Sequence, residues 1–358
     1  GALSFSLHPM QAAGIAMASA LSDLSACAFT LGAAAAYLRW AVPERPLLRW
    51  LVFSWMLAAL SGLCRWQGVG LPLTLLILDI YPLRRLPPDP RGWFKAGVWP
   101  ALAEKIPFII VSGGTAWFNS WAKMSQSGYV SPTMQPGPVA GAAVLFAAKF
   151  LFPVQLEPEY RFPSGGPGPH GWPAWADLAA VVGAGAALWH FRKKCPAALA
   201  AGAQYFLVLI PPFLLARPGV VLAYDRYPCL GYAAFGALAA GGLARVWGAP
   251  GGRRLKYLLG VLVLGTGWVL AGLTRDELRG WRDSVTLWTK HLEANPRAFI
   301  ARNNLGATLF EQGRKDEAYY FFLQEVALHP GEAIVQRNVK LAGQEFGPRG
   351  PHMAVVSN

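Results

Sequence analysis

The sequence predicts an all-α membrane protein, with a polytopic bundle of transmembrane helices over residues 1–274 and a short extracytoplasmic region of helical repeats over 275–346. Three observations lead to this prediction. The composition is too apolar for a soluble globule, eight apolar segments can cross a bilayer, and a 34-residue period starts after the last of them. The tail, 347–358, is predicted to be disordered.

The composition excludes a soluble domain. Apolar and aromatic residues make up 54% of the 358 residues, and the 39 glycines raise this share to roughly 65%, against about 45–50% in soluble domains. Charged residues make up 14%, against about 25% in soluble domains. The formal charge of +13 does not indicate nucleic-acid binding, because the basic residues form short clusters between apolar runs.

Apolar runs of about 20 residues cross a bilayer as helices, since every backbone polar group must then bond within the segment. The predicted spans are 20–39, 47–64, 68–83, 98–119, 174–191, 197–216, 228–247 and 257–274. A further apolar segment, 138–153, is shorter and contains Lys149. It is therefore predicted to be a re-entrant or interfacial helix on the extracytoplasmic side.

Basic residues cluster in alternate loops, which predicts the orientation of the bundle. The loops after the first, third, fifth and seventh spans hold 14 lysines and arginines, whereas the opposite loops hold far fewer. Cytoplasmic loops carry this excess, so the region after Thr274 is predicted to be extracytoplasmic. The high content of alanine, glycine and arginine indicates a GC-rich bacterial source and hence an inner membrane.

A repeat follows the last span. Trp288 and Phe322 form one of four pairs of similar or identical residues that are 34 positions apart. This is the period of tetratricopeptide repeats, which are pairs of antiparallel helices. A complete unit is predicted at 299–332, with partial repeats at 281–298 and 333–346, and a protein partner is expected for it. The predicted packing positions are Leu305, Gly306, Gly313, Ala318, Phe322 and Pro330.

Several strings, in this order and spacing, resemble one family over nearly the whole chain. The strings are LHPMQ (7–11), AAYLRW (35–40), GLPLTLLILDIYPLRRL (70–86), AEKIPF (103–108), KFLFPVQLEPEYRFP (149–163), AYDRYPCLGY (223–232), GWRDSVTLW (280–288), NNLG (303–306) and EQGRKDEA (311–318). The chain is similar to the transmembrane-and-TPR O-mannosyltransferases, which are multispanning membrane proteins with C-terminal tetratricopeptide repeats.

The resemblance implies a glycosyltransferase fold of the GT-C class. It also implies a sugar donor carried on a polyprenyl phosphate and an inverting transfer to a protein acceptor on the extracytoplasmic side. The implied catalytic base is an aspartate in a loop that would precede Gly1, so no catalytic residue is assigned within the chain. The chain begins inside an apolar stretch, and its N-terminal part is expected to be missing.

Six residues are candidates for binding the donor phosphate on the extracytoplasmic side. A guanidinium forms paired hydrogen bonds to phosphate, which favours an arginine at the mouth of a span, although an Asp–Arg pair that fixes a helix end is an equally simple interpretation. The candidates are Arg226, Arg65, Lys149, Asp225, Tyr227 and His8. Asp23 is expected to pair with Arg65 or Arg226. For His8, a structural role at the start of a helix is favoured over donor binding, because His-Pro pairs are common at helix starts.

Other polar residues lie within or beside the spans. Glu104 and Lys105 are at membrane depth and adjacent, so each is expected to find a partner elsewhere in the bundle. Asp79 is expected to anchor the cytoplasmic end of the third span. Inert packing is favoured for the cysteines, although a disulfide between Cys64 and Cys229 is conceivable. The histidine pattern predicts no metal site, and no cofactor is expected.

Two hypotheses of function follow. The first is a membrane glycosyltransferase whose repeats hold a protein acceptor. The second is an inactive membrane-anchored scaffold of the same fold. Two features favour the scaffold: the stretch 10–22 is apolar where the family has polar residues, and the implied catalytic loop is not in this chain. Separately, Glu325 is a local departure from the small residue usual in the repeat.

Overall fold

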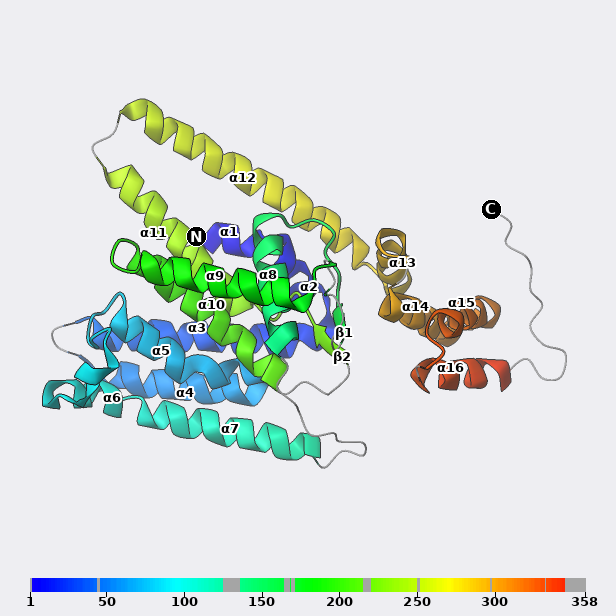
Figure 1. Cartoon of the computed structure of the whole chain (residues 1–358), viewed down its shortest axis with the longest axis horizontal. Helices are drawn as coiled ribbons and strands as arrows, with labels where there is room; N and C mark the ends of the chain where they lie inside the picture. Colours follow the sequence, from blue (N-terminus) through cyan, green and yellow to red (C-terminus); the bar gives the residue numbers. More distant parts are fainter. Residues whose placement is uncertain are drawn as a thin grey trace. The chain divides into compact units, whose positions relative to one another are not determined.

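In the part of the chain that the computed structural model describes, the regular structure is helical apart from one two-stranded ribbon, which confirms the predicted all-α class at that level (Figure 1). The structure describes residues 2–43, 46–124, 136–163, 168, 171–214, 220–249, 252–296, 298–331 and 333–344. The chain divides into two compact units, Gly1–Thr274 and Arg275–Asn358. Each unit is described by itself.

Among the described residues, three helices are long and apolar enough to cross a membrane, which indicates a membrane protein. They are α3 (Leu21–Ala41), α11 (Cys229–Gly248) and α12 (Arg253–Gly280). The apolar window of α12 is 0% buried against the rest of the chain. An apolar helix whose side chains are exposed on every side is stable in lipid. Contact between apolar side chains and lipid tails carries no free-energy cost, whereas contact with water does.

The other predicted spans also fall on helices, although these are not among the three long apolar helices of the described residues. The helices are α4 (Leu48–Cys64), α5 (Leu71–Ile80), α7 (Ile106–Met124), α9 (Ala174–His190) and α10 (Pro196–Leu214). A 3₁₀ turn, η3 (Trp66–Gly70), precedes α5, and the N-terminal residues form the short helices α1 (Ala2–Ser6), η1 (Pro9–Gln11), α2 (Ala12–Ala16) and η2 (Ala18–Ala20). The number of spans therefore stays a prediction.

The predicted span 98–119 is not one continuous helix, which corrects the sequence prediction. The short 3₁₀ turns η4 (Pro90–Phe94) and η5 (Ala96–Val98) lead into α6 (Trp99–Ala103), and a turn at Glu104 and Lys105 separates α6 from α7. Pro107 lies at the second position of α7. Proline has no N–H to donate and its ring collides with the carbonyl four residues earlier, so the helix breaks before it.

Small and hydroxyl-bearing residues hold α3 and α4 together, and these helices lie side by side in Figure 1. Ser54 Oγ donates to the carbonyl of Ala33 at 2.7 Å, and Ser61 Oγ donates to the carbonyl of Ala26 at 2.9 Å. Ser54 and Ser61 are fully buried. Small side chains let the two helix backbones approach closely. In a lipid bilayer the hydrophobic effect does not drive helices together, so these interhelical hydrogen bonds and the close packing hold α3 against α4.

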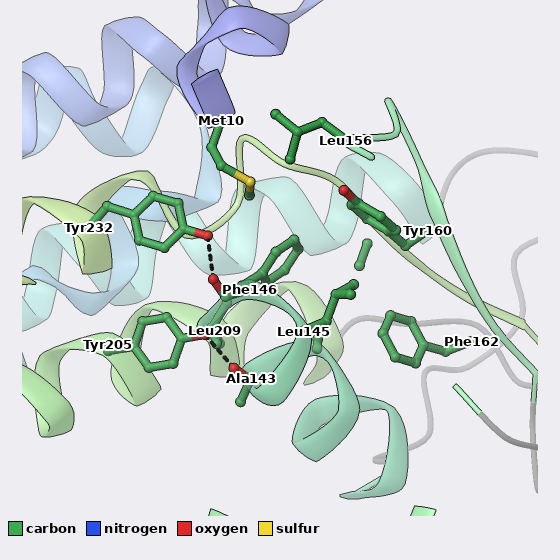
Figure 2. Packing of buried hydrophobic residues seen from close by; sticks show 12 residues of the cluster. Met10, Ala143, Leu145, Phe146, Leu156, Tyr160, Phe162, Tyr205, Leu209 and Tyr232 are labelled. Atoms are coloured by element: carbon green, nitrogen blue, oxygen red, sulfur yellow. Dashed lines mark hydrogen bonds between the residues drawn. The ribbon is translucent and has the colours of Figure 1, made fainter. Parts of the chain in front are cut away.

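A second core surrounds α8 (Pro136–Leu151), the segment predicted to be re-entrant (Figure 2). Phe146 is fully buried. Tyr205 of α10 donates from its hydroxyl to the Ala143 carbonyl at 2.6 Å, and Tyr232 of α11 donates to the Phe146 carbonyl at 2.9 Å (Figure 2). Both tyrosines thus bury an apolar ring and satisfy a polar group at the same time.

The ribbon pairs two segments that are far apart in the sequence. Strand β1 (Tyr160–Pro163) is antiparallel to β2 (Val220–Ala223), with Tyr160 opposite Ala223. We predicted no strand here, because each strand is only four residues long and its partner is not local. The pairing brings Glu159 beside the segment that carries Arg226.

The second unit contains α13 (Ser284–Ala294), α14 (Phe299–Glu311), α15 (Lys315–Leu328) and α16 (Ala333–Gln344), and each packs on the next. Its core includes the predicted packing residues Leu305, Ala318 and Phe322. Gly306 faces the ring of Phe322. Gly313 has φ +80° in the turn after α14, a conformation that glycine adopts without strain, and Pro330 lies in the turn before α16.

Glu325, the departure from the usual small residue, is fully buried on α15. Nη1 of Arg302, on α14, lies 2.8 Å from Glu325 Oε2, and the ring of His329 contacts Glu325 Oε1. Both carboxylate oxygens are therefore paired. A buried carboxylate is tolerated only in such a setting, because an unpaired buried charge costs several kcal/mol.

We expect Gly306→Ala to lower the free energy of unfolding of the second unit by about 1–3 kcal/mol, because a Cβ on Gly306 would lie 2.7 Å from the ring of Phe322. Gly343→Ala is the matched control. A Cβ on residue 343 would lie 3.6 Å from the Tyr319 ring, which is a normal van der Waals distance. The higher helix propensity of alanine should therefore raise the free energy of unfolding of this variant by up to about 1 kcal/mol. Denaturant unfolding of both variants checks the prediction, and equal effects would contradict it.

We also expect the second unit to lose stability in acid. Burial lowers the pKa of His291 from 6.5 to about 4, with Glu277 opposing and Lys290 reinforcing this shift. The unfolded state therefore binds the proton first, and stability that is complete above pH 6.5 falls as the pH drops towards 4, by up to about 3 kcal/mol. Between pH 7 and pH 4, the free energy of unfolding should fall less steeply with decreasing pH for His291→Leu than for the wild type. Identical slopes would exclude His291 as the cause.

Candidate functional site

Two arginines converge on one carboxylate in the first unit. Asp23 lies in the first turn of α3, Arg65 follows α4, and Arg226 lies between β2 and α11. Arg65 Nε is 3.1 Å from Asp23 Oδ1, and Arg226 Nε is 3.0 Å from Asp23 Oδ2. The expectation that Asp23 pairs with Arg65 or Arg226 is confirmed, since it pairs with both. We call these three residues the outer cluster.

The outer cluster carries an excess of positive charge. Two guanidinium groups face one carboxylate, whose side chain is 2% exposed, so the three residues together carry one positive charge. The Arg65 side chain is 39% exposed. Arg226 Nη1 contacts the sulfur of Met17 at 3.6 Å, and a thioether is only a weak acceptor. An anion with good acceptor oxygens would be a better partner for these nitrogens.

Aromatic rings flank Arg226. Its Cζ lies 4.1 Å from the ring centroid of Tyr224 and 5.9 Å from that of Tyr227. The Tyr224 hydroxyl donates to Glu159 Oε1 at 3.0 Å. Because Glu159 directly precedes β1 and Tyr224 directly follows β2, the ribbon holds both residues at this position. Glu159 and Tyr224 were not among the candidates from the sequence, although they belong to the strings KFLFPVQLEPEYRFP and AYDRYPCLGY.

Lys149 and Asp225 have partners outside the outer cluster. Lys149 Nζ donates to the carbonyls of Val154 and Gln155 at 2.6 and 2.8 Å. Asp225 is buried, and the hydroxyl of Tyr160 bonds to it. The structure therefore brings Arg226, Arg65 and Tyr227 together, while Lys149 and Asp225 lie around Tyr160.

His8 has a structural role. Its Nδ1 accepts a hydrogen bond from the backbone N–H of Met10 at 3.3 Å, and its Nε2 is 3.0 Å from the carbonyl oxygen of Phe150. The ring also stacks on that of Phe150, with centroids 5.1 Å apart. Both ring nitrogens are engaged, so His8 starts η1 and ties it to the end of α8.

A second polar group, which we call the inner cluster, joins Tyr37, Asp79, Arg85, Glu104 and Lys105. Arg85 Nη2 is 2.7 Å from Glu104 Oε1, and Lys105 Nζ contacts Asp79 Oδ2. The Tyr37 hydroxyl lies 2.9 Å from both Asp79 oxygens and accepts a hydrogen bond from Arg85 Nη1 at 2.6 Å. Two carboxylates balance two cations.

The inner cluster confirms one expectation and corrects another. Glu104 and Lys105 do find partners elsewhere in the chain. Asp79 is not an interfacial anchor, because its side chain is 0% exposed and it pairs with Lys105, which is 2% exposed. Sequence alone could not show this, since the five residues come from three separate strings, AAYLRW, GLPLTLLILDIYPLRRL and AEKIPF.

The cysteines also differ from the sequence interpretation. The sulfur atoms of Cys27 and Cys229 are 2.7 Å apart and buried. Cys229 therefore lies against Cys27, and the conceivable pairing of Cys64 with Cys229 is wrong. All four cysteines are free thiols in this structure.

Comparison of the chain with known protein families, with curated proteins and with solved structures gives no match. The family resemblance thus stands on the sequence strings alone.

We expect Asp79→Asn to destabilise the first unit by about 3–5 kcal/mol, because it leaves the buried ammonium of Lys105 with only the more distant Glu104 carboxylate, 4.0 Å away. The double variant Asp79→Asn/Lys105→Met should cost clearly less than the sum of the two single variants. Denaturation in detergent micelles measures all of them. The control is Asp276→Asn, whose ion pair with Arg279 is exposed and should be worth less than about 1 kcal/mol. Additive costs in the double variant would contradict the proposed coupling.

Proposed function

We propose that this chain is part of a membrane-embedded glycosyltransferase-like protein, and that its outer cluster binds the phosphate of a polyprenyl-phosphate-linked sugar. The observation that supports this proposal is the convergence of Arg65 and Arg226 on a single carboxylate. The two guanidinium groups can each form paired hydrogen bonds, and they share one buried carboxylate, that of Asp23, which suits them to bind a phosphate group. The sequence strings that resemble the O-mannosyltransferases support the same class of donor.

The charged groups suit such a donor. A polyprenyl-phosphate sugar is a phosphodiester with one negative charge, and Arg65 and Arg226 share one carboxylate, Asp23, while the nearby Glu159 carboxylate accepts from the Tyr224 hydroxyl. When the sugar leaves, the phosphate becomes a monoester and gains charge. Arg226, which is 11% exposed and flanked by Tyr224 and Tyr227, would stabilise this developing charge through hydrogen bonds in a poorly hydrated setting.

The neighbouring candidates have supporting roles in this proposal. Lys149 holds the turn after α8 through two carbonyls, and Asp225 holds Tyr160 of the ribbon. Together they position the segment that carries Arg226. We propose further that the bundle lies in a bacterial inner membrane and that the second unit is an extracytoplasmic tetratricopeptide-repeat module for a protein acceptor.

A scaffold without transfer activity is the second candidate. The observation that favours it is the pairing of Asp23, because both of its carboxylate oxygens face guanidinium groups and neither is directed at an acceptor hydroxyl. Asp23 is the polar residue that remains after the apolar stretch 10–22. In this case the same fold would bind its protein partner without any donor.

The decisive experiment measures binding of polyprenyl monophosphate by native mass spectrometry of the full chain in detergent. Arg226→Ala should weaken binding roughly 10- to 100-fold, because each hydrogen bond to a charged group is worth about 1.5–3 kcal/mol. Arg226→Lys keeps the charge without the fork and should give an intermediate loss.

Arg192→Ala is the matched control, since Arg192 lies in the turn after α9 and donates to the Trp189 carbonyl. It should bind the phosphate like the wild type. If Arg226→Ala also binds like the wild type while retaining its thermal midpoint, the phosphate role is wrong and the scaffold becomes the better hypothesis.

A further inference from the structure

Two cysteines that are 202 positions apart in the sequence meet inside the first unit. Cys27 lies in the second turn of α3, and Cys229 is the first residue of α11. Their sulfur atoms are 2.7 Å apart, and the residues are 3% and 7% exposed. Val208 and Leu230 complete this small apolar cluster.

We propose that Cys27 and Cys229 are a disulfide-forming pair that joins α3 covalently to α11. A disulfide bond needs two sulfur atoms at about 2.05 Å, carried by backbones that are already close. The two thiols here are in contact and come from helices that pack on each other. Within the described part of the chain, no group of three or more His, Cys, Asp or Glu residues could hold a metal ion, so the metal alternative for these thiols has no support there.

The position of the pair indicates where it is oxidised. Cys27 follows Asp23 by one helical turn, and Cys229 follows Arg226 by three residues, so the pair lies next to the outer cluster. The loop charges predict this end of the bundle to be extracytoplasmic. Disulfides form and persist in such compartments, whereas cytoplasmic thiols stay reduced.

The oxidation is a thiol–disulfide exchange. One cysteine thiolate attacks a disulfide of an extracytoplasmic dithiol–disulfide carrier, and a mixed disulfide forms. The second cysteine thiolate displaces the carrier, so the Cys27–Cys229 bond forms while the carrier leaves with two reduced sulfurs. The two protons of the cysteines are transferred to these two sulfurs. Because both side chains are buried in the folded bundle, the exchange belongs to the folding of the chain, before α3 and α11 close.

The link would also support the outer cluster. Asp23 and Cys27 are on the same face of α3, since residues four apart in a helix lie one above the other. Joining Cys27 to Cys229 therefore holds Asp23 and Arg226 in register. This inference does not depend on the proposed sugar donor, because it concerns the chain's own thiols.

The test uses the full chain with Cys64→Ser and Cys195→Ser, purified from the membrane without reductant. The protein is denatured and treated with N-ethylmaleimide. It should take up no label, and it should take up two labels after reduction. A peptide that joins the segments around residues 27 and 229 should appear in the unreduced digest and disappear on reduction.

The control is the chain with Cys27→Ser and Cys229→Ser, in which Cys64 and Cys195 should both take up label without reduction. This shows that labelling of the denatured chain is complete. Two labels on the unreduced Cys64→Ser/Cys195→Ser protein would overturn the proposal. The measurement is made after denaturation, so it does not require that the serine variants fold.

Discussion

The buried pairing of Asp79 with Lys105 is the interaction on which the inner end of the helical bundle depends. Neither charge reaches solvent, so each must be paired, and the contact between them is closer than the second pairs that Asp79 makes with Arg85 and Lys105 makes with Glu104. The rest of the inner cluster completes this pairing, with Tyr37 from α3, Arg85 from the loop after α5 and Glu104 from the turn before α7. The packing of four segments is thereby tied to one balanced set of charges.

The broken helix between α6 and α7 belongs to the same arrangement. The turn that separates α6 from α7 carries Glu104 and Lys105, and both side chains reach the inner cluster from it. Two consecutive charges are thus neutralised at one place ahead of Pro107. Lys105 Nζ also donates to the carbonyl of Ala101 at 2.9 Å, so this carbonyl of α6 has a partner where the helix ends.

The outer cluster differs from the inner cluster in charge and in access. Its two arginines share one carboxylate, Asp23, and Arg65 is partly exposed, whereas the inner cluster has two carboxylates for two cations and is almost closed. A closed, neutral group of charges stabilises a fold, while an open group with a remaining charge can bind an ion. The ribbon strengthens this distinction, because it holds Glu159, Tyr224 and Arg226 together at the end of α11.

Much of the local structure was already determined by the sequence. Apolar segments predicted where helices lie, Gly306 and Phe322 were identified as packing residues from a 34-residue offset, and the pairing of Asp23 followed from its place in the first span. These features depend on hydrophobicity and spacing along the chain. Only the tertiary structure decided which residues pair with Glu104 and that Arg302 forms an ion pair with the buried Glu325. It also decided the two-stranded ribbon and the contact between Cys27 and Cys229. Each of these joins groups from different elements, and charge, hydrogen bonding and thiol contact carry no local periodicity that would reveal the partner.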